Sequence, residues 1–191
     1  MDNQTESLFQ EENNKSRVDI LAITPGDFQL ELVHQLDDKD ASAIIDLSAF
    51  QEGDLEKNAR FNATSVRKYF HYPKTFPLLA RHKDIPVGYI VGITLESLNK
   101  ESWVKCDDHW GLGDTAYIHS FFVHPKYERL NYSRILLYVF TNWLSGLGFR
   151  FISGHEQEEI LDKYYSSCEK IKHFENWQNQ GQDFWYFRKK I

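Results

Sequence analysis

Several features that would indicate a function class are absent or scarce in this 191-residue sequence. Lys and Arg number 22 against 28 Asp and Glu, which gives a formal net charge of −6. A domain that binds duplex nucleic acid usually carries a basic surplus, so broad nucleic-acid binding is not expected. No apolar run approaches the roughly 20 residues that span a bilayer, so we also expect no membrane insertion.

Cysteine is equally scarce. The only two, Cys106 and Cys168, form no Cys-x-x-Cys spacing. The chain does not open on a basic stretch followed by an apolar one, so we expect no secretory signal, a cytoplasmic location and reduced thiols. A stretch beginning at His155 looks metal-binding at first, but the zinc pattern His-Glu-x-x-His needs a second histidine where Glu159 stands. We therefore expect no metal.

Hydrophobic residues make up 41% of the chain and charged residues 26%, which is enough apolar material for a core. The length favours one domain. The first residues are mostly polar, so we expect a flexible arm over residues 1–26 and a single domain over residues 27–191.

Hydrophobic periodicity predicts a mixed order of strands and helices. The expected strands begin at Phe28, cover 76–81, 86–94, 116–123, 149–153 and 183–188, and include one near Phe174; the expected helices run from about 38 to 48 and over 63–70, 133–147 and 158–171. The two strands at 76–81 and 86–94 form a hairpin. The loop over 98–113 is long enough to be a candidate functional loop. This order predicts an α/β (α+β) fold with a strand–helix–strand crossover towards its C-terminal end.

The segment from Tyr117 to Leu137 is the most informative. A strand ends at Val123, a polar loop follows, and a helix begins near Ser133. The first backbone N–H groups of a helix have no intrahelical partner and lie at the positive end of its dipole. Such a junction suits a phosphate or pyrophosphate.

At this point the sequence resembles the GNAT superfamily of acyl-CoA-dependent N-acyltransferases, whose fourth strand is followed by a Val-x-Pro-x-Tyr-like run and a Gly-rich turn into a helix. The positions that match are Val123, Pro125, Tyr127, Leu136 and Leu137. The turn departs from the family pattern, with Glu128 in place of Gln or Arg, Asn131 in place of the first Gly, and Ser133, itself small, at the position of the second Gly or Ala. A carboxylate at position 128 repels a phosphate, and Arg129 and Arg134 can offset it.

The resemblance implies a GNAT-like fold with a mostly antiparallel central sheet, splayed between the family's strands four and five, and helices on both faces. It also implies acetyl-CoA as co-substrate. Its pantetheine arm would lie beside Phe121, Phe122 and Val123, and its diphosphate on the N–H groups of Arg129, Leu130, Asn131, Tyr132, Ser133 and Arg134. The alternative is an ordinary strand–loop–helix crossover, which any α/β domain contains.

The proton chemistry of amide formation needs a group that accepts a proton from the amine. Side-chain alternation places Tyr117, His119, Phe121 and Val123 on one face of the strand. His119 is the best candidate base, with Tyr117 assisting, because the unperturbed pKa of histidine lies near neutrality. The resemblance adds that arylalkylamine N-acetyltransferases in the family carry His-x-His at these positions. The alternative is a core histidine bonded to a carbonyl.

The leaving CoA thiolate needs a proton in turn. Family members often take it from a tyrosine within Asn-x-x-Ala-x-x-x-Tyr in the helix after strand five. The same spacing places Tyr165 at that position, with Glu158 and Leu161 at the other two. Its neighbour Tyr164 stays open as the acid, and so does an amphipathic helix with packed tyrosines.

The resemblance therefore predicts an N-acetyltransferase that transfers an acetyl group from acetyl-CoA to a primary amine by direct attack. The acceptor would be a small-molecule or peptide amine, and the protein a monomer or homodimer. The alternative function is a non-catalytic GNAT-fold module that binds acyl-CoA or regulates a partner, and a structural protein with a coincidental element order is a third possibility.

Overall fold

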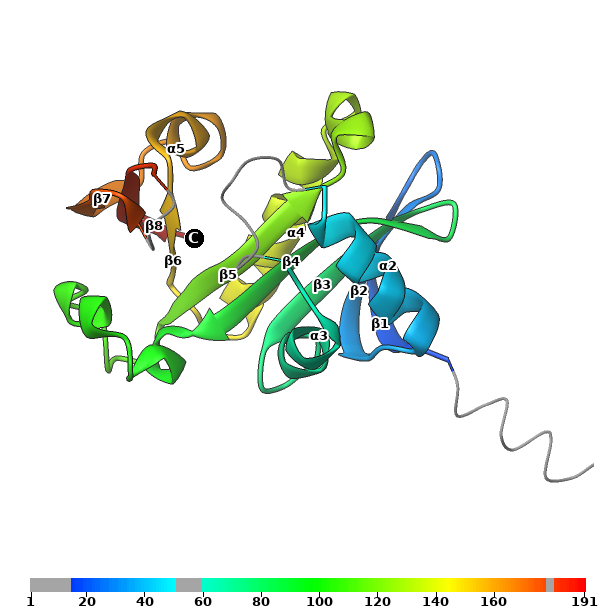
Figure 1. Cartoon of the computed structure of the whole chain (residues 1–191), viewed down its shortest axis with the longest axis horizontal. Helices are drawn as coiled ribbons and strands as arrows, with labels where there is room; N and C mark the ends of the chain where they lie inside the picture. The colour runs from blue at the N-terminus through cyan, green and yellow to red at the C-terminus, as the bar shows by residue number, and fades with distance from the viewer. Residues whose placement is uncertain (1–14, 51–59, 178–180) are drawn as a thin grey trace, which may run out of the picture.

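The computed structural model describes residues 15–50, 60–177 and 181–191, and its strands form one eight-stranded sheet (Figure 1). The strands are β1 (Arg17–Thr24), β2 (Phe28–Gln35), β3 (Phe76–His82), β4 (Ile85–Thr94), β5 (Thr115–Val123), β6 (Phe151–Glu156), β7 (Glu169–Phe174) and β8 (Phe184–Lys190). Their order is β1-β2-β3-β4-β5-β6-β8-β7. Neighbouring strands are antiparallel except β5 and β6, which run parallel. The mixed, mostly antiparallel sheet expected from the sequence is confirmed.

Helices lie on both faces of this sheet. The α-helices are α2 (Asp38–Ser48), α3 (Ala63–Tyr69), α4 (Tyr132–Gly146) and α5 (Glu158–Tyr164), and the 3-10 helices are η1 (Leu95–Leu98), η2 (Ser102–Cys106) and η3 (Pro125–Leu130). In Figure 1, α2 and α3 lie in front of the sheet and α4 lies behind it. None of the helices within the described residues is long and apolar enough to cross a membrane.

The seam between α4 and the sheet forms the larger part of the core. Leu136, Phe140 and Leu144 recur every four residues along α4, and all three are fully buried. Burying each such side chain contributes about 1.5–3 kcal/mol. A Cβ atom at Gly92 of β4 would lie only 2.6 Å from Cζ of Phe140, so the close approach of helix and strand requires glycine at this position.

The opposite face carries a second apolar layer, which fixes α2 and α3. Ile44 and Leu47 of α2 and Val66 of α3 pack in one cluster with Leu79 and Val91 of the sheet. These contacts fix the position of the C-terminal end of α3, which borders the candidate site.

A buried ion network ties α2 to the sheet. Arg81 of β3 donates from Nη2 to Asp40 of α2 at 2.5 Å and from Nε to Glu31 at 2.8 Å, and all three side chains are at most 13% exposed. Burial alone would raise the pKa of Asp40, but the hydrogen bonds from Arg81 and Ser16 outweigh it and the pKa is lowered. The network therefore holds α2 in register with β2 and β3.

A capping box begins α3. The Asn62 side chain accepts a hydrogen bond from Ser65 N at 2.9 Å, and Asn62 N donates to Ser65 Oγ at 2.7 Å. We expect Asn62→Ala to lower the free energy of unfolding by about 1 kcal/mol, because the first amides of the helix lose their acceptor. Urea unfolding measures the change. Asn62→Ser keeps a capping oxygen and should unfold close to the wild type; equal loss in both variants would contradict the capping role.

Two expectations about the chain ends are wrong. Arg17–Thr24 pairs with β2 as an edge strand, so the arm expected over residues 1–26 does not extend into this segment; residues 1–14 lie outside the described residues. Two register shifts in β1 break the alternation that would have indicated a strand. The helix expected over 158–171 ends at Tyr164, and residues from Glu169 form β7, which pairs with β8.

The loop over 98–113 is anchored to the C-terminal strand. Asp107 accepts hydrogen bonds from Tyr186 at 2.5 Å and from Arg188 at 2.6 Å, and its side chain is fully buried. A charge-assisted network of this kind holds the loop in place. The loop thereby brings Trp103 of η2 against Tyr117, with 5.3 Å between the ring centroids.

Candidate functional site

The sheet opens between β5 and β6. Only three pairs join the two strands, the last of them Tyr117 with Ser153, although β5 continues to Val123 and β6 to Glu156. In Figure 1 the two strands meet at one end and diverge towards α5 and η3. The splay expected between the fourth and fifth strands of the family pattern corresponds to this divergence. It leaves the backbone of residues 118–123 without a partner on β6.

A β-bulge lies in β5 where the strands separate. Gly92 pairs with Ile118 and Val91 pairs with Ser120, so His119 is the extra residue. The bulge changes which side chains share a face. Phe121 packs with the core around α4, whereas His119 lies against Tyr69 of α3.

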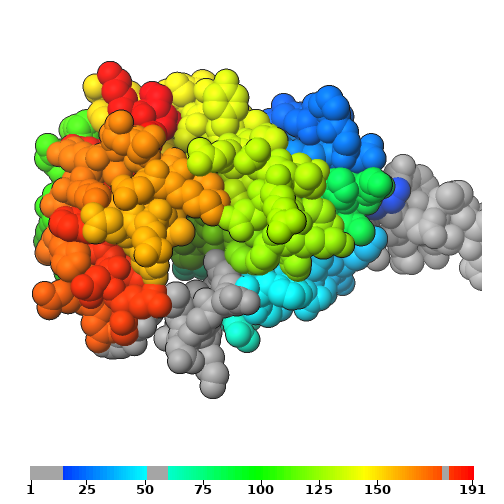
Figure 2. Space-filling model, turned by 90° about the horizontal axis from the view of Figure 1, so that it is seen from above, coloured from blue at the N-terminus to red at the C-terminus, as the bar shows by residue number. Residues whose placement is uncertain are grey.

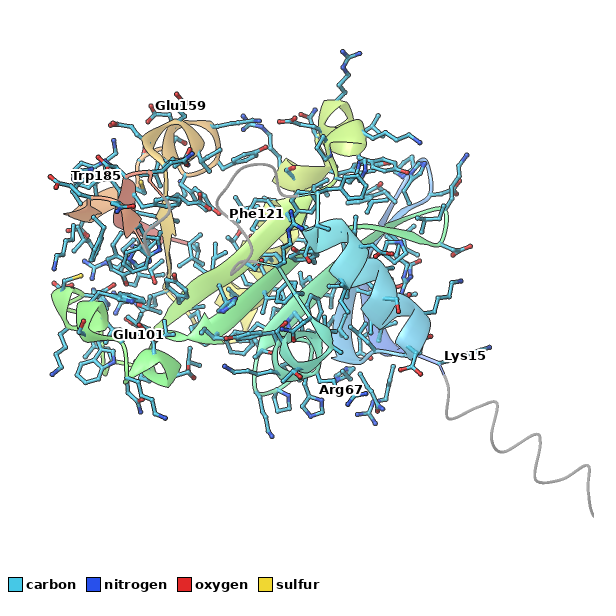
Figure 3. The ribbon with its side chains drawn as sticks, in the orientation of Figure 1. Lys15, Arg67, Glu101, Phe121, Glu159 and Trp185 are labelled. Carbon is cyan, nitrogen blue, oxygen red and sulfur yellow. The ribbon has the colours of Figure 1, made fainter. Side chains whose placement is uncertain are left out.

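The sequence-based expectation that Tyr117, His119, Phe121 and Val123 share one face is therefore wrong. Strict alternation holds only in an unbulged strand. Tyr117 and His119 lie on the α3 side, and Phe121 and Val123 lie on the α4 side. Figure 3 shows Phe121 on β5 and Trp185 on β8, on either side of the divergence.

The junction that leads into α4 presents free backbone amides. Asn131 adopts a left-handed conformation with φ 57°, and its carbonyl accepts the first helical bond, from Ile135 N, at 3.1 Å. The N–H groups of Tyr132, Ser133 and Arg134 precede that bond and have no acceptor among the described residues. With the helix dipole behind them, these amides fit an anion.

Glu128 in η3 does not leave an uncompensated negative charge beside these amides. Its carboxylate pairs with Lys163 of α5. Seen from above in Figure 2, the η3 segment (lime green) and the α5 segment (orange) lie side by side, as this pair requires. Both side chains are about half exposed, so the pair contributes little stability.

His119 has a buried imidazole. Its ring lies 4.0 Å from the ring of Tyr69, between centroids, and its Nδ1 has no hydrogen-bond partner in the described part of the chain. Burial, with a smaller contribution from the charge of Lys68, lowers the pKa of His119 to about 4. The imidazole is therefore neutral at neutral pH and can accept a proton.

Tyr117 pairs with a histidine that the sequence reasoning had considered only as part of a zinc pattern. The Tyr117 hydroxyl lies 3.0 Å from His155 Nδ1, and the His155 ring stacks on Trp177 with 3.9 Å between centroids. Burial lowers the pKa of His155 to about 3, and its Nε2 has no partner in the described residues. Side-chain alternation along the strand that contains His155 could have indicated that His155 lies beside Tyr117.

The two candidate acids occupy different environments. Tyr165 is fully buried, its ring packs on Phe187 at 4.5 Å between centroids, and burial raises its pKa well above 10. Tyr164 is half-buried and faces the divergence. Its ring lies 5.9 Å from that of Phe121, and the Arg134 guanidinium lies 5.8 Å from its centroid.

A half-buried carboxyl group, Glu156, lies at the end of the divergence. It is the last residue of β6, and burial raises its pKa to about 8. Sequence reasoning did not single out this residue, because a glutamate just before a helix normally lies in water. In the described part of the chain, no three His, Cys, Asp or Glu side chains gather as metal ligands do.

The unpartnered groups around the divergence fit a polar ligand with a phosphate at one end. His119 Nδ1, His155 Nε2 and the Tyr165 hydroxyl are buried without partners within the described residues, and the free amides of α4 lie at the open end. The opened sheet thus has free helix amides at its open end and titratable side chains along its walls.

A model of the Acetyltransferase (GNAT) family matches residues 43–165. The chain belongs to the GNAT acetyltransferase family. No curated protein sequence matches the chain significantly.

Solved structures support the same fold. Arabidopsis thaliana NAA60 in complex with a bisubstrate analogue has a TM-score of 0.65 and 13% identity, over 86% of this chain and 98% of that one. Arabidopsis thaliana Naa50 in complex with the bisubstrate analogue CoA-Ac-MVNAL has a TM-score of 0.63 and 19% identity, over 86% and 99%. The ribosomal-protein-S18-alanine N-acetyltransferase from Escherichia coli has a TM-score of 0.62 and 11% identity, over 86% and 94%.

Proposed function

We propose that this protein is an N-acetyltransferase that transfers an acetyl group from acetyl-CoA to a primary amine. The observation that carries the proposal is the opened β5–β6 pair, which leads from free amides at α4 to buried, unpartnered proton-accepting groups. Acetyl-CoA supplies the acetyl group as an activated thioester. The amides of Tyr132, Ser133 and Arg134 would hold its diphosphate, together with those of Arg129, Leu130 and Asn131 in the same junction.

The remaining roles fall to residues of β5 and to Tyr165. Phe121, Phe122 and Val123 would bind the pantetheine arm, because their backbone faces no strand on the β6 side. His119 would accept a proton from the amine. Tyr117, whose hydroxyl is held by His155, would orient the amine or an intervening water. Tyr165 would donate a hydrogen bond from its hydroxyl to the sulfur.

A small-molecule or peptide amine is the acceptor that the relatives favour. The Escherichia coli neighbour is an alanine N-acetyltransferase, and the Naa50 complex contains an analogue that includes the sequence MVNAL. The acceptor would approach from the α3 side, where His119 and Tyr117 lie. No metal takes part in this scheme.

Two measurements test this function. Acetyl-CoA should raise the melting temperature of the protein, and free thiol should then appear when an amine from a panel of small amines and peptides is added. A thermal shift without thiol release for any amine would favour the non-catalytic acyl-CoA-binding module instead. The absence of any shift would refute both.

The amide cradle at α4 can be tested by charge. We expect Asn131→Asp to weaken acetyl-CoA binding about tenfold, because a carboxylate some 6 Å from a diphosphate costs about 1.4 kcal/mol at an effective dielectric constant near 40. The same charge favours the helix N-terminus, so thermal stability should be unchanged or raised. Calorimetric titration at low salt measures the dissociation constant.

The matched control is Asn131→Gly. Glycine adopts the φ of 57° at no steric cost and carries no charge, so acetyl-CoA should bind at least as tightly as to the wild type. Equal affinities of the Asp and Gly variants would show that the diphosphate does not lie on these amides.

A further inference from the structure

The imidazole of His119 is paired with no carboxylate in the described part of the chain. Three other histidines, His34, His109 and His173, each have a carboxylate oxygen within 3.6 Å. The Nδ1 atom of His119 is instead buried without any hydrogen-bond partner among the described residues. A histidine base is usually oriented by a hydrogen bond to its second ring nitrogen, which also fixes the tautomer. Packing has to take over that task here.

Tyr69, the last residue of α3, supplies this packing. Its ring lies 4.0 Å from the imidazole of His119 between centroids, with 35° between the two planes. The ring of Phe61, which is only 6% exposed, lies 6.2 Å from that of Tyr69. Aromatic rings at these separations prefer particular relative orientations, so a fixed tyrosine ring restricts the ring that it contacts.

The backbone of Tyr69 is itself fixed at the end of α3 (Figure 1). Thr75 Oγ1 donates a hydrogen bond to the carbonyl oxygen of Tyr69 at 2.6 Å, and Thr75 is buried. The next residue, Phe70, is 2% exposed and packs in the cluster that joins α2 and α3 to the sheet. A residue that positions another side chain needs such a rigid support.

The hydroxyl of Tyr69 is engaged by a different residue. Lys68 Nζ donates a hydrogen bond to it at 3.1 Å and lies 4.6 Å from the centroid of the same ring. The contact with His119 is therefore a property of the tyrosine ring, and the hydroxyl is not required for it.

Cover by a side chain affects His119 more than any charge does. Burial is the larger cause of the low pKa of His119, and the charge of Lys68 is the smaller one. Lys68 is the only charged group within the described residues that acts on this imidazole. The carboxylates of Glu101 and Glu156 act on the hydroxyl of Tyr117 instead.

We propose that Tyr69 is a positioning residue for the base: its ring holds the imidazole of His119 in the orientation that receives the proton of the amine, and it keeps bulk water away from that imidazole. This inference rests on the proposed acetyl transfer. In the step, an N–H bond of the attacking amine breaks and an N–H bond forms on the imidazole, which then passes the proton to solvent. Tyr69 neither gives nor takes a proton.

The first test needs no ligand. In nuclear magnetic resonance spectra, the imidazole signal of His119, assigned through its loss in His119→Gln, should stay unchanged from pH 8 to 5.5, because its pKa is about 4. In Tyr69→Ala water reaches the ring, and the midpoint should rise by at least about 1 pH unit. Lys68→Met should raise it by less, because the charge is the smaller cause. An unchanged midpoint in Tyr69→Ala would overturn the inference.

The second test is kinetic and uses saturating acetyl-CoA and amine. Tyr69→Ala should lower kcat at least about tenfold, because a misoriented base accepts the proton poorly, and should leave the dissociation constant of acetyl-CoA unchanged. Its kcat should also decline at a higher pH than that of the wild type on the acid side. Tyr69→Phe keeps the ring and should recover most of the lost kcat. Tyr138→Ala, which removes a tyrosine of α4 that is 69% exposed, should match the wild type.

The outcomes separate this inference from the proposed function. If the wild type releases no thiol with any amine, the acetyltransferase proposal fails and the positioning role falls with it. If the wild type turns over and Tyr69→Ala keeps its kcat and pH profile, the function stands and the inference on Tyr69 is wrong. An equal loss in Tyr69→Phe and Tyr69→Ala would also overturn it, since the hydroxyl would then be responsible. Tyr69→Leu, which fills more space but has no flat ring, replaces Tyr69→Ala in both tests should that variant not fold.

Discussion

His119→Gln is expected to lower kcat about 100-fold and to leave the dissociation constant of acetyl-CoA unchanged. In the proposed mechanism the neutral imidazole of His119, on the α3 side of the opened sheet, accepts the proton, and its Nδ1 has no protein partner in the described residues. Glutamine retains the polarity and approximate size of the side chain but cannot take up a proton. Steady-state thiol release and an acetyl-CoA titration measure the two quantities.

The low pKa of His119, about 4, adds a pH signature. A histidine with the ordinary pKa of 6.5 would lose activity as pH falls through that value, whereas His119 should stay in its active neutral form down to about pH 4. The matched control is His71→Gln, an exposed histidine just after α3, which should keep full activity. A loss of less than about threefold in His119→Gln would remove the base from the mechanism.

Patterns that depend on neighbouring residues were predictable from the sequence. The helix expected over 133–147 is α4, and the hairpin expected over 76–94 is β3 and β4, because continuous apolar spacing determines both. The free amides at the start of α4 were also predictable, since a helix that follows a polar loop exposes its first amides wherever it lies.

Features that depend on contacts distant in sequence were not predictable. The bulge at His119 arises from the register with Gly92 and Val91, and it reverses the facing of every residue after it. The Tyr117–His155 pair joins positions 38 residues apart. Glu156 lies at the divergence because β6 continues beyond its pairing with β5, and this depends on the register of two strands that are distant in sequence.

Folding stability is expected to reach a maximum near pH 6.5 and to fall on both sides. Three groups with shifted pKa values titrate between pH 3 and 8: His155 at about 3, His119 at about 4 and Glu156 at about 8. The two histidines bind more protons in the unfolded chain, where their pKa is 6.5, so their contribution to stability is lost as pH falls below that value.

Glu156 acts in the opposite direction. Its pKa of about 8 in the folded state lies above the ordinary 4.5, so the stability that it contributes is present below pH 4.5 and is lost as pH rises towards 8. Between pH 4.5 and 6.5 the contribution of the two histidines, which grows with pH, exceeds the loss caused by Glu156. The free energy of unfolding therefore rises with pH in this range. Above 6.5 the histidines of the unfolded chain finish losing their protons while Glu156 ionises in the folded protein, and stability should fall by about 1 kcal/mol up to pH 8.

Urea unfolding at pH 4.5, 6.5 and 8 measures this profile. Glu156→Gln should abolish the decline between 6.5 and 8 and should exceed the wild type in stability at pH 8, because the wild type ionises a carboxyl group with a raised pKa there and the variant does not. Glu159→Gln should follow the wild type. The lysines with raised pKa values, Lys163 and Lys170, lose their contribution only above about 10.5, outside this window. A curve that falls as steeply in Glu156→Gln as in the wild type from pH 6.5 to 8 would show that Glu156 does not cause the decline.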